Sequence, residues 1–366
     1  MAYHLGCTAL VASLKYLHDP PLHRKLVVLS HLFAITENGR IREEYVLDQH
    51  VPMVTVVIPT FNRPKFLTRA IESVLRQTIR NFEVIVIIDG FDPATKDAIE
   101  QIHDPRVRYL ELTVKVGGAE ARNIGVRLAN GKWIALLDDD DEWLPKKLER
   151  QLAPTQSVPI DGMLVTSRYI CHSPETADVV RPRRLPRTGE PISEFMFDYL
   201  CYFQTSTFLC SKSLYLRVPF DRELLFFHDI DWFLRVSQDK AFELVVIDEP
   251  LSVYHVPVER FSITSALDWK ARLEWGRCRR HLLSKRAYSR FVIGTCVGRA
   301  VEDGAGWKGF ATLLKEAVVV GSATPYLVVL LCSTYVLSPK RRRQLRDMLF
   351  FTKVKTPHSH SADHVS

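Results

Sequence analysis

Hydrophobic residues follow a regular pattern along the chain from Met53 onward. Short runs rich in Val and Ile alternate with stretches in which apolar residues recur at helical spacing. The runs predict strands at residues 53–59, 82–89, 107–112 and 133–137, and the stretches between them predict helices at residues 63–75, 94–102 and 118–129. Strands that alternate with helices in this way are typical of βαβ units. We therefore expect an α/β fold with a Rossmann-like, mostly parallel central sheet and helices on both of its faces.

The pattern loosens after Arg150. Strands are expected at residues 163–170, 205–210 and 242–247, a helix at residues 229–238, and an Arg- and Pro-rich loop at residues 180–194. This mixed half follows the parallel half directly, so we expect one domain over residues 51–265, with its two halves at 51–150 and 151–265. A basic and mostly helical region is expected at residues 266–355.

Both ends of the chain are expected to lie outside this domain. We interpret residues 1–50 as an N-terminal helical extension whose role the sequence does not reveal. Its apolar patch is preceded by His4 and followed by Lys15, which is not the charge arrangement of a signal peptide. Residues 356–366 are polar and are expected to be disordered.

Composition places the chain among ordinary globular proteins. Its 366 residues are 46% hydrophobic and 25% charged, which is enough apolar material for a real core. Seven cysteines without a CxxC pair support neither a disulfide framework nor a zinc site, and they are typical of a reducing cytoplasm. The net charge of +7 suits anionic partners such as nucleotides, phosphorylated lipids, membrane surfaces or nucleic acid, without choosing among them.

One segment tests whether the chain crosses a membrane. Ala317–Pro339 carries no charge, is long enough to span a bilayer, which takes about 20 residues, and is followed by the basic run Lys340–Arg343. Gly321, Ser322, Thr324 and Pro325 interrupt it near its middle. We therefore favour two buried helices joined by a turn at Ser322–Pro325, or a shallow membrane contact, over a true span.

Polar residues follow three of the predicted strands: Pro59–Asn62, Asp89–Gly90 and Asp138–Asp141. The carboxyl ends of parallel strands lie on one rim of a sheet, where ligands bind. Four adjacent carboxylates repel one another, and burial strengthens the repulsion. A divalent cation such as Mg²⁺ or Mn²⁺, shared with substrate phosphates, would relieve it. The alternative, a solvated acidic loop that caps the next helix, explains Glu142 better than the aspartates that directly follow the strand.

Two further patterns are ambiguous on their own. Asp229, in the stretch Phe227–Arg235, suits either a general base or a simple helix cap. Gly117 and Gly118 open a helix that could receive a phosphate at its N-terminus, or they form an ordinary loop-to-helix junction. The chain has neither a GxGxxG nor a GxxxxGK[ST] sequence.

Together these motifs resemble the family-two glycosyltransferases. The resemblance is carried, in order, by VTVVIPTFNRPKFLTRAIESVLRQT, FEVIVIID, GGAEARNIGVRLANGKWIALLDDDDEWLPKKLERQ and HDIDWFLRV. It extends from about Val54 to Ser262 and is most specific over its first hundred residues. It implies a GT-A fold, a nucleotide-sugar donor, a divalent metal and a transfer that inverts the anomeric carbon.

The resemblance also implies roles for residues of the nucleotide-binding half. Asp89 would pair with the nucleobase, and Arg122 would reach toward the donor phosphates. The residues that would line the pocket for base and ribose are Pro59, Thr60, Phe61 and Asn62.

The acidic segment and the later helix receive roles in the same way. Asp138, Asp139 and Asp140 cover the DxD motif, in which Asp140 is the best metal ligand and Asp138 or Asp139 would touch the ribose or the metal's surroundings. Asp229 matches the catalytic base. His228 replaces the usual Glu beside it, and a cationic His228 would lower the pKa of Asp229. At the second strand, Ile88 and Phe91 also depart from the family's pattern.

The sequence therefore predicts an inverting, metal-assisted glycosyltransferase with Mg²⁺ or Mn²⁺ as cofactor. A UDP-sugar is the favoured donor, with GDP- or dTDP-sugars as alternatives, and the acceptor is a hydroxyl of a glycan, a lipid-linked molecule or a small molecule. We expect no nucleic-acid partner. The expected location is the cytoplasm, with the C-terminal region at the inner face of the membrane. A non-catalytic nucleotide-sugar-binding subunit or scaffold, and a nucleotidyltransferase, are the competing interpretations.

Overall fold

The computed structural model describes residues 32–35, 41–44, 51–156, 161–198, 201–256 and 267–337. The chain divides into two compact units, Met1–His50 and Val51–Ser366. In the first unit, β1 (Leu32–Ile35) and β2 (Ile41–Glu44) pair as antiparallel strands. The prediction of a helix was wrong at these eight residues, and the rest of residues 1–50 lies outside the described part.

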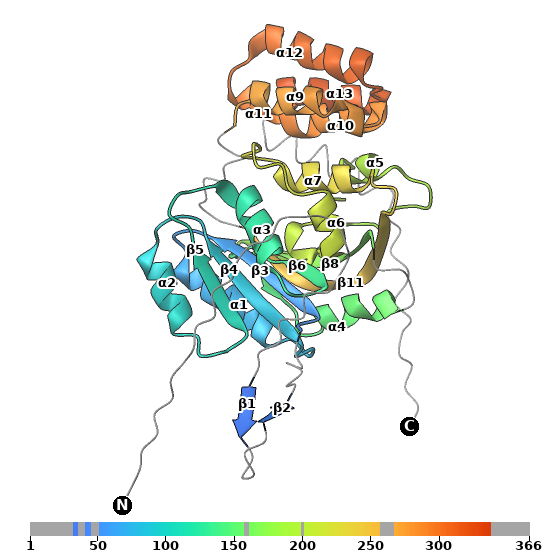
Figure 1. Ribbon diagram of the computed structural model, residues 1–366. Coiled ribbons are helices and arrows are strands. Elements are labelled where there is room, and N and C mark those ends of the chain that lie inside the picture. The colour runs from blue at the N-terminus through green and yellow to red at the C-terminus, as the bar shows by residue number, and fades with distance from the viewer. Residues whose placement is uncertain are drawn as a thin grey trace, which may run out of the picture. The chain divides into compact units, whose positions relative to one another are not determined.

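The second unit is built on a mixed sheet that is mostly parallel (Figure 1). The order of its strands is β5-β4-β3-β6-β10-β8-β11-β7, and β9 pairs with β8. Strand β3 is parallel to both β4 and β6, and β11 is parallel to β8, whereas β10 and β7 run antiparallel to their neighbours. The strands are β3 (Val54–Thr60), β4 (Phe82–Ile88), β5 (Val107–Glu111), β6 (Trp133–Leu136), β7 (Glu142–Trp143), β8 (Met163–Ser173), β9 (Thr176–Arg181), β10 (Leu209–Ser211) and β11 (Glu243–His255). The predicted α/β fold is confirmed.

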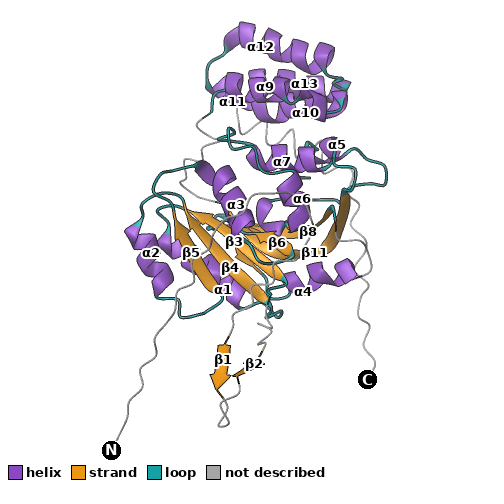
Figure 2. Cartoon of the chain, viewed as in Figure 1, coloured by secondary structure: helices purple, strands orange, loops and turns teal. Residues whose placement is uncertain are grey.

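Helices cover both faces of this sheet (Figure 2). Alternate residues of β3 face opposite ways, so Val56 belongs to one hydrophobic core and Val57 to the other. The first core contains α1, α2 and α4, and the second contains α3, α5, α6 and α7. These helices are α1 (Pro64–Leu75), α2 (Pro93–Glu100), α3 (Gly117–Leu128), α4 (Lys147–Leu152), α5 (Ile192–Met196), α6 (Lys212–Arg217) and α7 (His228–Val236).

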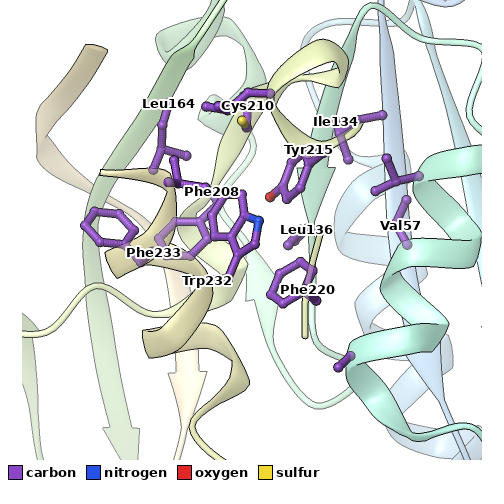
Figure 3. Close-up of a cluster of buried hydrophobic side chains, with 14 of the residues drawn as sticks. Val57, Ile134, Leu136, Leu164, Phe208, Cys210, Tyr215, Phe220, Trp232 and Phe233 are labelled. Carbon is purple, nitrogen blue, oxygen red and sulfur yellow. The ribbon is translucent and has the colours of Figure 1, made fainter. Parts of the chain in front are cut away.

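Stacked aromatic rings fix α7 against the second half of the sheet. Trp232 of α7 is completely buried, and its ring stacks on Tyr215 at 4.5 Å and on Phe220 at 5.1 Å between ring centres (Figure 3). Its indole N–H donates to the backbone oxygen of Val218 at 2.8 Å. Large aromatic rings that are both buried and hydrogen-bonded hold one orientation, so α7 has little freedom to rotate.

The C-terminal helices form a third hydrophobic core, which α7 shares through Leu234. In Figure 1 they gather next to α5 and α7. Two π-helical turns, at Val292–Val297 and Glu316–Val320, interrupt them. The helices are α9 (Trp269–Cys278), α10 (Lys285–Phe291), α11 (Gly298–Glu302), α12 (Gly306–Lys315) and α13 (Pro325–Val336).

The uncharged segment folds as a turn followed by α13. The helix begins at Pro325, and Thr324 caps it by accepting a hydrogen bond from the N–H of Leu327. The predicted turn is confirmed, but Leu331 is the only residue of α13 that is fully buried, so the prediction of a buried helix holds only in part. Within the described residues, no helix combines the length and the hydropathy that a bilayer crossing requires. The run Lys340–Arg343 and the predicted disordered tail lie outside the described residues.

The contact between α3 and β3 yields a test of this packing. A Cβ added at Gly125 would lie 2.3 Å from Val57 Cγ1, so Gly125→Ala should lower the free energy of unfolding by roughly 1–3 kcal/mol through overpacking. Gly298→Ala is the matched control, because nothing lies within 4 Å of its added Cβ. That change should leave stability unchanged or raise it by up to about 1 kcal/mol. Urea unfolding measures both, and equal effects of the two changes would contradict the close contact.

Candidate functional site

The acidic segment lies where the strand order of the sheet reverses. The chain moves outward from β3 to β4 and β5, then returns to β6 on the other side of β3. In α/β sheets this reversal opens a crevice beyond the carboxyl ends of the two strands. Thr60 ends β3, and its hydroxyl donates to Asp139 Oδ2 at 2.8 Å. The ends of these two strands therefore meet on one rim, as the sequence predicted.

Burial alternates along the acidic segment. Asp139 and Asp141 are 5% and 1% exposed, whereas Asp138 and Asp140 are only partly buried. Asp141 is held by donors from the second half of the domain: Ser206 Oγ at 2.6 Å, Gln204 Nε2, and the backbone N–H of His255 at 3.4 Å. The two partly exposed carboxylates, two residues apart, are therefore the ones that remain accessible to a ligand.

Arginines supply much of the positive charge that the acidic segment needs. Arg63 Nη1 lies 3.0 Å from Asp139 Oδ1 and 3.7 Å from Asp140 Oδ2. Arg69 donates to the backbone oxygen of Asp140. A third arginine, Arg122, reaches the segment from α3. From the sequence, a bound cation was expected to supply the compensating charge, whereas the structure shows that the chain contributes cations of its own.

Burial also changes the charge of the segment. It raises the pKa of Asp141 to about 8, with the nearby charge of Asp138 as the second cause, although the hydrogen bonds from Ser206, Gln204 and His255 N–H oppose this rise. Burial likewise raises the pKa of Asp139, although the Arg63 guanidinium opposes this. Burial therefore opposes ionisation of the two buried carboxyl groups of the segment.

Arg122 connects the acidic segment to the start of α7. It is 6% exposed, and it pairs through Nη2 with Asp138 and through Nη1 with His228 Nε2 at 3.0 Å and Gly118 O at 3.1 Å. Guanidinium nitrogens only donate, so His228 Nε2 accepts and the imidazole is neutral. Burial, and then the charge of Arg122, lower the pKa of His228. The condition for the predicted effect of His228 on Asp229, a cationic imidazole, is therefore not met in this geometry.

Asp229 does not cap its helix. The N-cap of α7 is Phe227, with a left-handed φ of 54°, and no side chain caps the helix there. Asp229 Oδ1 accepts from the N–H of Ile230 at 2.9 Å, and Oδ2 accepts from the hydroxyl of Tyr202. Burial, and then the charge of Asp229, raise the pKa of Tyr202, so this phenol remains a donor. The interpretation of Asp229 as a simple cap is thus not supported.

Asp89 already has donors within the chain. Its two oxygens accept from the N–H of Val116 at 2.7 Å and of Gly117 at 3.0 Å, where α3 begins. Each carboxylate oxygen has a second lone pair, so a nucleobase could still be bound. The carboxylate is therefore satisfied within the chain and does not need a nucleobase as its donor. The Gly117–Gly118 junction is therefore occupied by a carboxylate of the chain itself.

The remaining predicted pocket residues lie beside Asp89. The Lys115 ammonium makes a cation–π contact with the Phe61 ring, 3.3 Å from the ring centre. The same ring lies close to Gly90, whose φ is 120°. Asn62 also has a positive φ, of 59°, and its N–H donates to Asp92 at 2.6 Å. Pro59 is paired with Ile87 inside the sheet. The structure thus brings the predicted pocket residues together at the ends of β3 and β4.

Sequence reasoning missed five side chains that shape this site: Arg63, Arg69, Tyr202, Gln204 and Ser206. For the first two a signal was available, because Arg63 is the N-cap of the helix that follows the first strand and Arg69 lies in its second turn. The other three lie in or beside the segment predicted as a strand at residues 205–210. The structure instead forms a 3₁₀ turn at Thr205–Thr207, and β10 begins only at Leu209.

Sequence comparisons relate this chain to known glycosyltransferases. The family model described as "Glycosyl transferase family 2" matches residues 55–224. The putative colanic acid biosynthesis glycosyl transferase WcaA of Escherichia coli K12 is 29% identical over 218 residues, which cover 59% of this chain and 76% of that protein. The uncharacterized glycosyltransferase MJ1057 of Methanocaldococcus jannaschii is 30% identical over 214 residues, covering 56% of this chain and 71% of that protein.

Solved structures support the fold. The crystal structure of Staphylococcus aureus TarS 1-349 in complex with UDP-GlcNAc superposes with a TM-score of 0.52 at 14% identity, covering 82% of this chain and 92% of that one. This likeness identifies the sheet and its helices as a GT-A fold. The sequence matches and the motifs on one rim show more: the chain is a glycosyltransferase and belongs to glycosyl transferase family 2.

Proposed function

We propose that this glycosyltransferase inverts the anomeric carbon of a nucleotide-sugar and uses Asp229 as its general base. One observation carries the proposal: Asp229 lies in the first turn of α7, whose first residue, His228, is tied through Arg122 to Asp138 of the rim. The carboxylate is therefore held near the donor rim although the fold does not need it as a cap. Family membership favours glycosyl transfer over nucleotidyl transfer and over a scaffold role.

The reaction places each group in a defined role. Asp229 takes the proton of an acceptor hydroxyl, and the hydroxyl oxygen attacks the anomeric carbon. The bond from that carbon to the diphosphate breaks on the opposite face, so the configuration inverts and a nucleoside diphosphate leaves. The Tyr202 hydroxyl orients the carboxylate by hydrogen bonding to Oδ2. General-base help of this kind contributes about 10²–10⁴-fold to the rate.

Asp138 and Asp140 fit a divalent metal. They are the two partly exposed carboxylates of the segment, and hard oxygen ligands of this kind bind Mg²⁺ or Mn²⁺ together with substrate phosphates. Among the described residues no three His, Cys, Asp or Glu side chains gather as a cage, so phosphate and water would complete the ligand set. When bound, the metal would neutralise charge on the leaving diphosphate. Arg63 and Arg122 lie beside the same carboxylates and would share that task.

A UDP-sugar donor is supported by two comparisons. A relative in Escherichia coli, named UDP-Glc:alpha-D-GlcNAc-diphosphoundecaprenol beta-1,3-glucosyltransferase WfgD, is 30% identical over 133 residues, which cover 36% of this chain and 53% of that protein. TarS was crystallised with UDP-GlcNAc. The name of WfgD also describes a lipid-linked acceptor, which we extend to this chain together with a cytoplasmic location at the membrane. Asp89 and Phe61 would line the pocket for the base.

The C-terminal helices would bring such an acceptor close. α13 carries no charge, and Val329 and Val336 on it are more than half exposed. An apolar helix surface that is followed in the sequence by the basic run Lys340–Arg343 suits a shallow contact with anionic lipid.

Asp229→Asn tests the base. Asn cannot accept the proton of the acceptor hydroxyl, so kcat should fall at least about 100-fold while the donor KM changes little. Asp268→Asn is the matched control, because Asp268 is a true helix cap that accepts from Ala271 N–H at 2.7 Å, and Asn caps equally well. Release of nucleoside diphosphate from a UDP-sugar measures both. A folded Asp229→Asn protein with the wild-type rate would remove the proposed base.

Asp140→Ala tests the metal site. The change should abolish Mn²⁺-stimulated turnover and weaken Mn²⁺-dependent donor binding, because one of two accessible carboxylates is lost. Asp97→Ala, an exposed aspartate on α2, should leave both unchanged. Calorimetric titration of UDP with and without Mn²⁺ measures the binding. Full wild-type activity in EDTA would contradict metal assistance.

The membrane contact predicts behaviour in vesicle sedimentation. The protein should sediment with vesicles of phosphatidylglycerol and phosphatidylcholine, and high salt should release it, because the basic residues contribute about 1 kcal/mol each near an anionic surface. Val329→Glu should weaken the binding, whereas Leu216→Glu, at a similarly exposed residue of α6, should not. Absence of binding, or equal loss in both variants, would refute this surface.

A further inference from the structure

The start of α7 adopts a conformation that local sequence does not favour. Phe227 has a left-handed φ of 54°, which bulky residues rarely adopt, and no side chain caps the helix that follows. Such conformations persist only where surrounding packing holds them. The Phe227 ring packs against Trp275 of α9 at 5.1 Å and Phe291 of α10 at 6.2 Å between ring centres. The C-terminal helices therefore hold the backbone two residues before Asp229.

A second contact from the same helices reaches the first turn of α7. Asp231 has no exposed surface, and its two oxygens accept from two guanidinium groups. One is Arg235, one turn later on α7, with its Nε at 2.7 Å from Oδ2. The other is Arg279, which directly follows α9 and donates through Nε to Oδ1. Arg279 Nη2 also pairs with Asp221, in the segment before α7, at 2.6 Å.

These contacts do different things for the helix. The pair with Arg235 lies within α7 and moves with it. Arg279 instead ties the first turn of α7 to a separate group of helices and to the segment before α7, in a planar fork that a lysine cannot reproduce. Asp229 lies two residues before Asp231 on the same helical turn, so a displacement of Asp231 also displaces Asp229. Small displacements of a catalytic group reduce rates steeply.

We propose that Arg279 is a positioning residue for Asp229, supplied by the C-terminal helical region, so that this region is part of the catalytic apparatus. The inference rests on the proposed role of Asp229 as the base. In this role Arg279 acts on α7 through Asp231 and not on the donor or the acceptor. Arg279 holds the first turn of α7 through Asp231. Arg122 holds the same turn through His228, and Tyr202 holds it through Asp229.

The test compares two arginines that belong to the same helix end. Arg279→Met removes the guanidinium and keeps most of the apolar stem. Arg277→Met is the matched control, because Arg277 pairs with Glu316 at 2.6 Å inside the helical region and not with α7. We expect Arg279→Met to lower kcat about 10- to 100-fold with the donor KM within about twofold. Arg277→Met should keep kcat within about twofold of wild type even where its melting temperature falls equally.

A double mutant separates positioning from stability. If Arg279 acts through Asp229, adding Arg279→Met to Asp229→Asn should lower kcat no further, because the carboxylate it places is already gone. Multiplying losses would overturn the proposal. Arg279→Lys keeps a positive charge beside buried Asp231, so this variant should fold even if Arg279→Met does not. A lysine cannot pair with Asp221 at the same time, so we expect a kcat between those of the wild type and Arg279→Met.

The outcomes separate this inference from the proposed function. An Asp229→Asn protein with the wild-type rate would refute the base itself. An inactive Asp229→Asn protein beside an Arg279→Lys or Arg279→Met protein with wild-type kcat would refute the positioning role alone. A loss of kcat in Arg277→Met as large as in Arg279→Met would also refute it, because only general stability would then be involved.

Discussion

The buried guanidinium of Arg122 is the interaction on which the arrangement of this site depends. A charge with almost no exposure must be paired, and Arg122 finds its partners in both halves of the domain: Asp138 on the rim and His228 at the start of α7. The separation between the carboxylates proposed to bind metal and the proposed base is thus set by one planar side chain. Arg122 also forces His228 to remain neutral, because the imidazole must accept its hydrogen bond. Glu beside the base, as the family often has, would pair with this arginine as an ion instead.

Much of the fold could be predicted because its signals are local. Runs such as Phe82–Ile88, short and rich in β-branched residues, favour buried strands. The ends of parallel strands share a rim, so the sequence alone places Asp138–Asp141 on that rim. The error at Leu32–Ile35 has an equally local cause. Four apolar residues are too few for their periodicity to separate a strand from a helix.

The parts of the site that could not be predicted depend on pairings across the chain. Gln204 and Ser206 donate hydrogen bonds to Asp141, which lies more than 60 residues earlier in the sequence. Tyr202 donates to Asp229, which lies 27 residues later, after α6. Hydrophobic periodicity locates elements but does not say which polar side chains face one another across them. Repulsion among the aspartates was overestimated for the same reason. Neighbours in sequence reveal neither the Arg63 guanidinium nor the rise in the pKa of Asp141 that burial causes.

The order of the strands has a consequence for the curvature of the sheet. β6 and β7 are four positions apart in the sheet, which in a flat sheet would be about 19 Å at about 4.8 Å per strand. Only residues 137–141 join them, and even fully extended they reach about 20 Å. They are not extended, because Asp141 N–H donates to Asp138 O at 3.1 Å and closes a turn. The sheet must therefore curl so that its edge strand β7 approaches the central strand β6. The length of the acidic segment sets the largest distance between these two strands.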